Sequence, residues 1–284
     1  MKYIIIGGVA GGATTAARIR RIDEKSEIIL LEKGKYISYA NCGLPYYIGG
    51  IIEERNKLFV QTPQSFSKRF VVDVRTESEG IKIIPEKNEV EIKSKGQTYV
   101  EKYDKLLLSP GAIPFKPSLK GIDTEGIFTL RNVTDTDQIK EYVKSRKINN
   151  AVIIGGGFIG LEMAENLYHL GASVSIVEMI NQVMAPIDFS MATLVHQHLQ
   201  QKGVKLYLEQ TVESFGKDEN GIIVNFKNGE SIPADIVILS IGVRPETTLA
   251  KDANLKIGET GGIWVDEYLQ TSDKNIYAIG DAIE

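Results

Sequence analysis

Two stretches of the sequence decide the fold: residues 3–12, YIIIGGVAGG, and residues 151–160, AVIIGGGFIG. Each begins with an apolar run, continues into a cluster of glycines and leads into a helical pattern. A second apolar run then ends on an acidic residue, Glu32 in the first copy and Glu178 in the second. This succession of strand, glycine turn, helix and strand is typical of the βαβ unit that binds dinucleotides. The repetition predicts an α/β chain with two such units.

The second glycine cluster is a complete G-x-G-x-x-G. We expect Gly155 to form the tight turn, Gly157 to let the backbone approach a pyrophosphate, and Gly160 to let the helix pack closely on the strand. Glu178 can accept hydrogen bonds from the 2′-hydroxyl of an adenosine ribose, and residues 179–181 supply no arginine for a 2′-phosphate. This unit is therefore predicted to bind NADH in preference to NADPH, with NADPH possible.

The first glycine cluster departs from the motif at one position. Val9 stands where the glycine that approaches the pyrophosphate is expected. Gly7 and Gly12 still suit the turn and the helix contact, and Glu32 still ends the second strand. We therefore expect a dinucleotide here as well, with a modified loop geometry.

Short strands separated by turn residues follow each unit. Residues 71–103 and about 211–232, the latter with a hairpin turn at Asn220-Gly221, predict two antiparallel meanders. Each meander leads into a buried strand and then a break containing Gly and Pro, where the chain is expected to cross between domains. The predicted fold is two Rossmann-like domains, each with a small meander. Their boundaries are residues 1–113 with 246–284 for the first, and 114–245 for the second.

Composition excludes several classes of function. The 284 residues carry a net charge of −4 with both signs dispersed, so no basic field for nucleic acid is expected. The apolar stretch 3–17 is rich in Gly and shorter than a membrane span of about 18 residues, so no membrane anchor and a cytoplasmic location are expected. His196 and His198 are predicted to lie on solvated helix faces, and no metal site is expected.

Cys42 is the only cysteine, so the chain can form no internal disulfide and contains no C-x-x-C motif. It lies in residues 37–47, ISYANCGLPYY, before a predicted helix. A helix N-terminus favours the nucleophilic thiolate. The alternative is a small buried core residue. The polar neighbours Ser38 and Asn41 favour a functional role.

Five segments in order resemble a known family. They are residues 7–13 (GGVAGGA), 38–46 (SYANCGLPY), 109–112 (SPGA), 155–162 (GGGFIGLE) and 275–282 (NIYAIGDA). The sequence is similar to the single-cysteine branch of the FAD-dependent pyridine nucleotide-disulfide oxidoreductases, and within it to the coenzyme A disulfide reductases. The resemblance covers the whole chain.

The resemblance implies a set of site residues. Cys42 would be the redox-active nucleophile, Phe158 an aromatic gate over the nicotinamide pocket, and Glu162 a carboxylate beside the reacting edge of the flavin. FAD would be held in the first domain by Gly7, Gly12, Glu32, Lys33, Ala112, Gly280 and Asp281. NAD would be held in the second by Gly155, Gly157, Phe158, Gly160, Glu162 and Glu178. CoA would contact Thr14, Arg18, Arg21, Ser38 and Asn41.

The spacing of Arg18 and Arg21 agrees with the CoA assignment, because residues three apart share a helix face and two guanidinium groups can bind phosphates. The alternative is a solvated basic face. The implied activity passes electrons from NAD(P)H through flavin and Cys42 to CoA disulfide.

Three alternatives to this activity remain. One is an NADH oxidase or peroxidase that cycles Cys42 through a sulfenic acid. Another is an NADH-dependent persulfide or polysulfide reductase. The third is a nucleotide-binding fragment without turnover. Relatives in the family continue beyond the Gly-Asp-Ala motif into an interface domain that builds a homodimer. Because this chain ends three residues after Asp281, we expect it to be a piece of a longer, dimeric protein whose interface domain it lacks.

Overall fold

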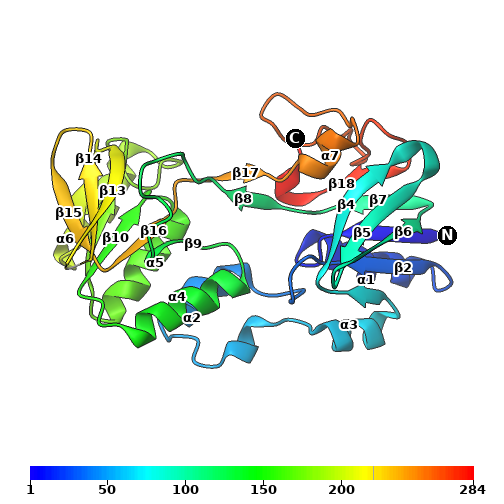
Figure 1. Cartoon of the computed structure of the whole chain (residues 1–284), viewed down its shortest axis with the longest axis horizontal. Coiled ribbons are helices and arrows are strands. Elements are labelled where there is room, and N and C mark those ends of the chain that lie inside the picture. The colour runs from blue at the N-terminus through cyan, green and yellow to red at the C-terminus, as the bar shows by residue number, and fades with distance from the viewer. Residues whose placement is uncertain (220) are drawn as a thin grey trace. The chain divides into compact units, whose positions relative to one another are not determined.

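The computed structural model describes residues 1–219 and 221–284, which form two compact units (Figure 1). The first unit contains residues 1–40, 59–113 and 244–284. The second contains residues 41–58 and 114–243. Two of the crossings lie in the short strands β8 (Ala112–Pro114) and β17 (Val243–Pro245), which pair with each other. Residues 41–58, placed in the first domain by the sequence analysis, pack within the second unit.

The first unit is built on a five-stranded parallel sheet in the order β18-β7-β1-β2-β3. Its strands are β1 (Lys2–Ile6), β2 (Glu27–Leu31), β3 (Asp73–Arg75), β7 (Lys105–Leu108) and β18 (Ile276–Ala278). Successive side chains of a strand point to opposite faces. Ile4 and Ile5 of the central strand therefore enter different cores, and both are fully buried.

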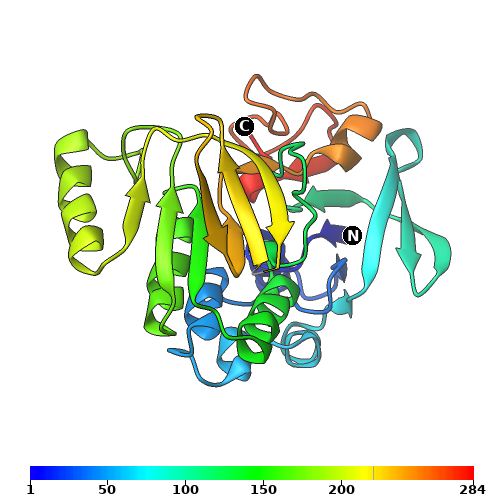
Figure 2. The same ribbon diagram turned by 60° about the vertical axis from the view of Figure 1, so that its left-hand side comes forward.

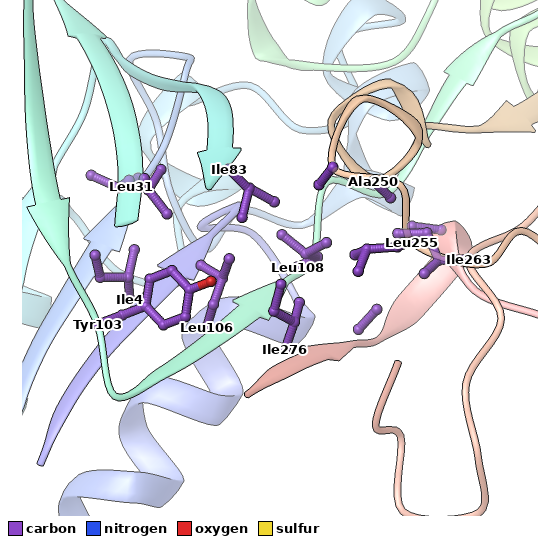
Figure 3. Packing of buried hydrophobic residues seen from close by; sticks show 14 of the residues in the cluster. Ile4, Leu31, Ile83, Tyr103, Leu106, Leu108, Ala250, Leu255, Ile263 and Ile276 are labelled. Atoms are coloured by element: carbon purple, nitrogen blue, oxygen red, sulfur yellow. The ribbon is translucent and has the colours of Figure 1, made fainter. Parts of the chain in front are cut away.

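Different layers cover the two faces of this sheet. Helices α1 (Gly11–Ile22) and α3 (Pro63–Phe70) pack on one face. The antiparallel strands β4 (Ser78–Ile84), β5 (Glu89–Ser94) and β6 (Gln97–Lys102), together with α7 (Thr248–Asp252), lie on the other. Figure 3 shows the core between the sheet and this second layer, which Leu106 and Leu108 of β7 share with Ile83 from β4 and Ala250 from α7.

The second unit repeats the parallel sheet in the order β12-β11-β10-β16-β9. Its strands are β9 (Ile127–Thr129), β10 (Asn150–Ile154), β11 (Ser173–Val177), β12 (Lys205–Tyr207) and β16 (Ile236–Leu239). The strand order matches that of the first unit, with β10 in the place of β1 and β11 in the place of β2. The predicted α/β fold with two Rossmann-like units is confirmed.

Helices and an antiparallel sheet again cover opposite faces. Helix α5 (Phe158–His169) packs on β10, β11 and β16, whereas α4 (Val133–Ser145) contacts β9 and α6 (Phe189–Gln201) contacts β12. Figure 2 shows the antiparallel strands β13 (Val212–Asp218), β14 (Gly221–Phe226) and β15 (Ser231–Ala234) in yellow and orange. The predicted hairpin turn at Asn220-Gly221 includes a residue outside the described ones.

One predicted element has a different partner from the one expected. The sequence predicts residues 73–75 to belong to the first antiparallel meander, but β3 joins the parallel sheet beside β2. The meander itself begins at Ser78 and pairs as three antiparallel strands. Among residues 1–219 and 221–284, no helix is both long and apolar enough to cross a lipid bilayer.

Candidate nucleotide-binding loops and redox cysteine

The first glycine loop connects the carboxyl end of β1 to α1. Gly7 has a φ of +100°, and a Cβ atom there would lie 2.0 Å from the carbonyl oxygen of Ser109. A Cβ atom on Gly12 would lie 1.8 Å from the carbonyl oxygen of Gly7. Both positions therefore require glycine, because only glycine permits this backbone approach. The loop lies at the carboxyl edge of a parallel sheet, where such sheets bind ligands.

The acidic residue that ends β2 holds this loop. Glu32 accepts a hydrogen bond from Gly8 N–H through Oε2, at 2.8 Å, and from Gly34 N–H through Oε1, at 2.7 Å. Each carboxylate oxygen has further acceptor capacity, so hydroxyl groups of a ribose can bind at the same residue. Lys33 follows it on the surface.

The other predicted flavin residues lie in the same unit. β18 is parallel to β7, so Gly280 and Asp281 follow its carboxyl end at the edge that carries the first glycine loop. Gly280 has a φ of +80°, and apart from its chain neighbours no described residue has an atom within 4 Å of the place of a Cβ. Ala112 is buried at the start of β8. The residues present thus fit a dinucleotide at this edge.

The second glycine loop has the corresponding geometry. Gly155 has a φ of +104°, and its Cβ would lie 2.4 Å from the Ser240 carbonyl oxygen. A Cβ on Gly160 would lie 2.1 Å from the carbonyl oxygen of Gly155. Gly157 caps the start of α5, and among the described residues no atom other than those of its chain neighbours lies within 4 Å of its Cβ position. The space beside Gly157 is therefore open to a pyrophosphate, which a helix N-terminus attracts.

The two loops differ where the sequence departs from the motif. Helix α5 begins at Phe158, but α1 begins at Gly11, one position later than the counterpart of Phe158. Ala10, at the position equivalent to Phe158, precedes α1 with helical φ and ψ angles. Val9 occupies the place of the open Gly157, so the backbone cannot be approached there in the same way.

Glu178 repeats the arrangement of Glu32 at the end of β11. Its Oε2 accepts a hydrogen bond from Gly156 N–H at 2.7 Å, and its Oε1 accepts one from Ile180 N–H at 3.2 Å. Phe158, in the first turn of α5, is 62% exposed. All six predicted NAD residues lie in the second unit.

Cys42 lies in the second unit and is exposed. It belongs to a single 3-10 turn, Asn41–Gly43, that leads into the short helix α2 (Leu44–Ile48). α2 packs against α4 and α5. The alternative of a small buried core residue is therefore wrong, and the thiol is accessible for chemistry.

Side chains of α4 fasten the cysteine segment. The Nζ of Lys140 donates a hydrogen bond to the carbonyl oxygen of Tyr47 and lies 4.0 Å from the centre of that ring. Arg55 donates two hydrogen bonds to the carboxylate of Asp137, at 2.8 and 2.6 Å. Such bidentate pairs are stronger and more directional than ion pairs with one hydrogen bond. Together with the packing of α2 on α4 and α5, this pair holds residues 41–58 to the second unit.

Two carboxylates of α5 raise the pKa of groups near Cys42 in the sequence and on α5 itself. Burial, followed by the charge of Glu165, raises the pKa of Glu162. The charge of Glu162 in turn raises the pKa of Tyr46, with further contributions from burial, Glu165 and Cys42. Tyr46 and Glu165 were not among the predicted site residues, although Tyr46 follows Cys42 by one helical turn and Glu165 follows Glu162 by three residues.

The predicted CoA residues are divided between the units. Thr14, Arg18 and Arg21 are exposed on α1, and the guanidinium carbon of Arg21 lies 6.0 Å from the ring centre of Phe70. Their spacing of four and three residues places them on one helix face. This surface supplies two cations to solvent.

Ser38 and Asn41 stand on either side of the boundary between the units. Ser38 has a φ of +45°, and its N–H donates to the carbonyl oxygen of Gly8 at 3.0 Å. The left-handed backbone is tied to the first glycine loop. Asn41 is exposed in the turn that contains Cys42.

The prediction for one histidine is wrong. His196 is buried, and its Nε2 accepts a hydrogen bond from Val183 N–H at 3.1 Å. Burial lowers the pKa of this imidazole. It supports the segment that follows β11 and does not face solvent. In the described part of the chain, no group of three or more His, Cys, Asp or Glu residues could hold a metal ion.

Two glycine loops on matching parallel sheets are the arrangement expected of proteins that bind two dinucleotides, and the exposed Cys42 adds an accessible thiol. The chain belongs to the pyridine nucleotide-disulphide oxidoreductase family, whose model matches residues 1–284. The predicted family is thereby confirmed. FAD together with NADH or NADPH, the predicted cofactors, are those of this family.

The chain is similar to three known proteins of this kind. Coenzyme A disulfide reductase of Staphylococcus aureus (strain JH9) is 35% identical over 282 residues, which is 99% of this chain and 63% of that protein. A crystal structure of reduced Bacillus anthracis CoADR-RHD is 54% identical with a TM-score of 0.97, covering 100% of this chain and 51% of that one. The structure of a NAD-dependent persulfide reductase from A. fulgidus is 41% identical with a TM-score of 0.96, and the match covers 100% of this chain and 53% of that one. The chain thus spans between about half and 63% of the length of these relatives.

Proposed function

We propose that the protein transfers two electrons from NADH, by way of bound FAD and Cys42, to coenzyme A disulfide. The observation that carries the proposal is the exposed position of the only cysteine, in a turn fastened to a unit whose glycine loop suits NAD. The name of the S. aureus relative supports this choice of substrate.

The two loops would bind the cofactors through their backbones. The first would hold FAD by Gly7 and Glu32, and the second NADH by Gly157 and Glu178. When bound, FAD accepts a hydride from NADH and supplies an electron pair for the reduction of sulfur. Phe158, exposed at the start of α5, is suited to shield the nicotinamide pocket from water.

At Cys42 the chemistry is thiol–disulfide exchange. The thiolate attacks one sulfur of the CoA disulfide, the sulfur–sulfur bond breaks, and one CoA thiolate leaves. Two electrons then break the mixed disulfide and release the second CoA. One NADH, one proton and one disulfide give NAD⁺ and two thiols. The phenol of Tyr46 is protonated at neutral pH, where it can donate a hydrogen bond to an anionic sulfur, and the charge of Glu162 raises its pKa further.

A persulfide substrate is the second candidate, because a relative that is 41% identical to this chain is named a persulfide reductase. The Cys42 thiolate would attack the outer sulfur of CoA persulfide, so that its sulfur–sulfur bond breaks and CoA leaves as the thiolate. Two electrons and a proton would then convert the cysteine persulfide to the Cys42 thiolate and hydrogen sulfide. The active protein is proposed to be a homodimer, which sedimentation would test.

The experiment compares the native protein, loaded with FAD, with Cys42→Ser. We expect the substitution to abolish NADH-dependent reduction of CoA disulfide and to leave the bleaching of flavin absorbance by NADH unchanged. Disulfide reduction that persists in the variant would refute the role of Cys42. Release of sulfide from CoA persulfide without activity on the disulfide would select the second candidate. Oxygen consumption without either would select an oxidase.

A further inference from the structure

A cavity of about 500 Å³ lies within the second unit, remote from its glycine loop. Asn149 and Ala172, which precede β10 and β11, contribute to its lining. The cavity therefore opens at the amino edge of the parallel sheet, whereas the glycine loop follows the carboxyl end of β10. Five residues of strand separate the two edges by roughly 16 Å. A ligand here would not share the nucleotide site.

The charged side chains that line this cavity are all basic: Lys140, Lys144, Arg146 and Lys147. Arg146 is paired with Glu125 at 2.5 Å. Lys140 donates to a backbone carbonyl. In the described part of the chain, the side chains of Lys144 and Lys147 have no hydrogen bond or ion pair, and both are exposed. Two ammonium groups are thus available at the rim.

Helix stabilisation explains only part of this cluster. Cations near a helix C-terminus interact favourably with the macrodipole, which accounts for Lys144 in the last turn of α4. It does not account for Lys147, which follows the helix. Lys140 and Lys144 are like charges one turn apart, an arrangement that costs stability. Burial and then the charge of Lys144 lower the pKa of Lys140. A bound anion would relieve this repulsion.

Apolar side chains form the rest of the lining. Ile48 comes from the end of α2, Val143 from α4, and Leu167 and Leu170 from the end of α5. Leu167 is buried, whereas Leu170 is 45% exposed at the edge of the cavity. The volume lies within the range of about 300–1,000 Å³ that is usual for small-molecule sites. The lining thus combines an apolar wall with a cationic rim.

We propose that this cavity binds a small organic anion that has an apolar body and a phosphate or carboxylate head group. Lys144 and Lys147 would bind the head group, since lysine serves phosphate as a point charge. The side chains at the ends of α2 and α5 would cover the apolar body. The site does not depend on the activity of Cys42.

The test is calorimetric titration of the whole 284-residue chain with hexyl phosphate, repeated with hexanoate, inorganic phosphate and hexanol. We expect one of the two amphipathic anions to bind, and the tighter one identifies the head group. Inorganic phosphate and hexanol should each bind at least about tenfold more weakly, because each meets only half of the lining. Saturating NADH should leave the binding unchanged. Absence of binding by both anions, or their displacement by NADH, would overturn the proposal.

Variants separate the two halves of the site. The double substitution Lys144→Gln with Lys147→Gln should weaken binding by about tenfold, as expected for the loss of two exposed charge pairs. The matched control is Lys202→Gln with Lys205→Gln, exposed lysines of the same unit, and should change binding less than about twofold. Leu170→Ala should weaken the amphipathic anion and leave inorganic phosphate unaffected. Equal effects of both double substitutions would overturn the site.

Discussion

The discrimination between NADH and NADPH provides a quantitative test of the second glycine loop. Glu178 is half-buried at the end of β11 and accepts hydrogen bonds from Gly156 and Ile180. Glu178→Gln removes the negative charge but keeps an oxygen that can accept the bond from Gly156 N–H. The substitution therefore alters electrostatics at the ribose position while leaving the loop in place.

The size of the effect follows from Coulomb's law. Two unit charges 4 Å apart interact by about 1 kcal/mol in water and about 4 kcal/mol at an effective dielectric constant of 20. Glu178 lies between these limits, so about 2 kcal/mol of repulsion toward a 2′-phosphate is expected, which corresponds to roughly thirtyfold in affinity. The ratio of the dissociation constants for NADPH and NADH should fall by about that factor in Glu178→Gln.

The assay is titration of the protein with each nucleotide, followed by the fluorescence of the reduced nicotinamide. The matched control is Glu32→Gln, because Glu32 holds the first loop through the same pair of contacts. That variant should retain less FAD and leave the ratio for the two nicotinamide nucleotides unchanged. An unchanged ratio in Glu178→Gln, or an equal change in both variants, would refute the assignment of NAD to the second unit.

Three further predictions concern the loops, a histidine and the cysteine segment. Gly157→Ala has room for its Cβ, so it should leave the melting temperature within about 2 °C of the native value while weakening NADH binding. Gly160→Ala has no room for its Cβ and should lower both the melting temperature and the affinity for NADH. Equal behaviour of the two variants would contradict this geometry. Burial lowers the pKa of His196, so the unfolded chain binds more protons and the free energy of unfolding should fall as the pH drops through about 6.5. His196→Gln should flatten that pH profile in urea titrations, and an unaltered slope would exclude this histidine as the cause. Arg55→Gln breaks the bidentate pair with Asp137 and should speed hydrogen exchange in residues 41–58; unchanged exchange would show that the pair does not fasten the segment.

The parallel sheets could be predicted because their signals are local. Runs such as residues 3–6 and 151–154 are apolar without interruption, as strands buried on both faces must be. The glycines that follow are required by contacts with backbone carbonyls, so their positions also carry the turn geometry. β3 was assigned wrongly because Asp73–Arg75 is three residues long and charged at both ends, and only its pairing with β2 defines it.

The surroundings of Cys42 could not be predicted because they depend on contacts distant in sequence. Arg55 and Asp137 are 82 residues apart, and Lys140 lies 93 residues from Tyr47. The sequence contains no local pattern that pairs them. The buried position of His196 has the same origin, since its partner is a backbone N–H of another segment. Sequence motifs thus predict the candidate site residues, whereas the contacts that hold these residues in place are seen only in the structure.

Attack of the Cys42 thiolate on CoA disulfide is tested most directly by the intact mass of the protein after incubation with CoA disulfide, measured before and after a thiol reductant. We expect a single adduct of one CoA, removed by the reductant and absent from Cys42→Ser. An adduct that forms equally on Cys42→Ser would refute this role of Cys42. So would a native protein that takes up only oxygen atoms, because that result requires Cys42 to work through a sulfenic acid.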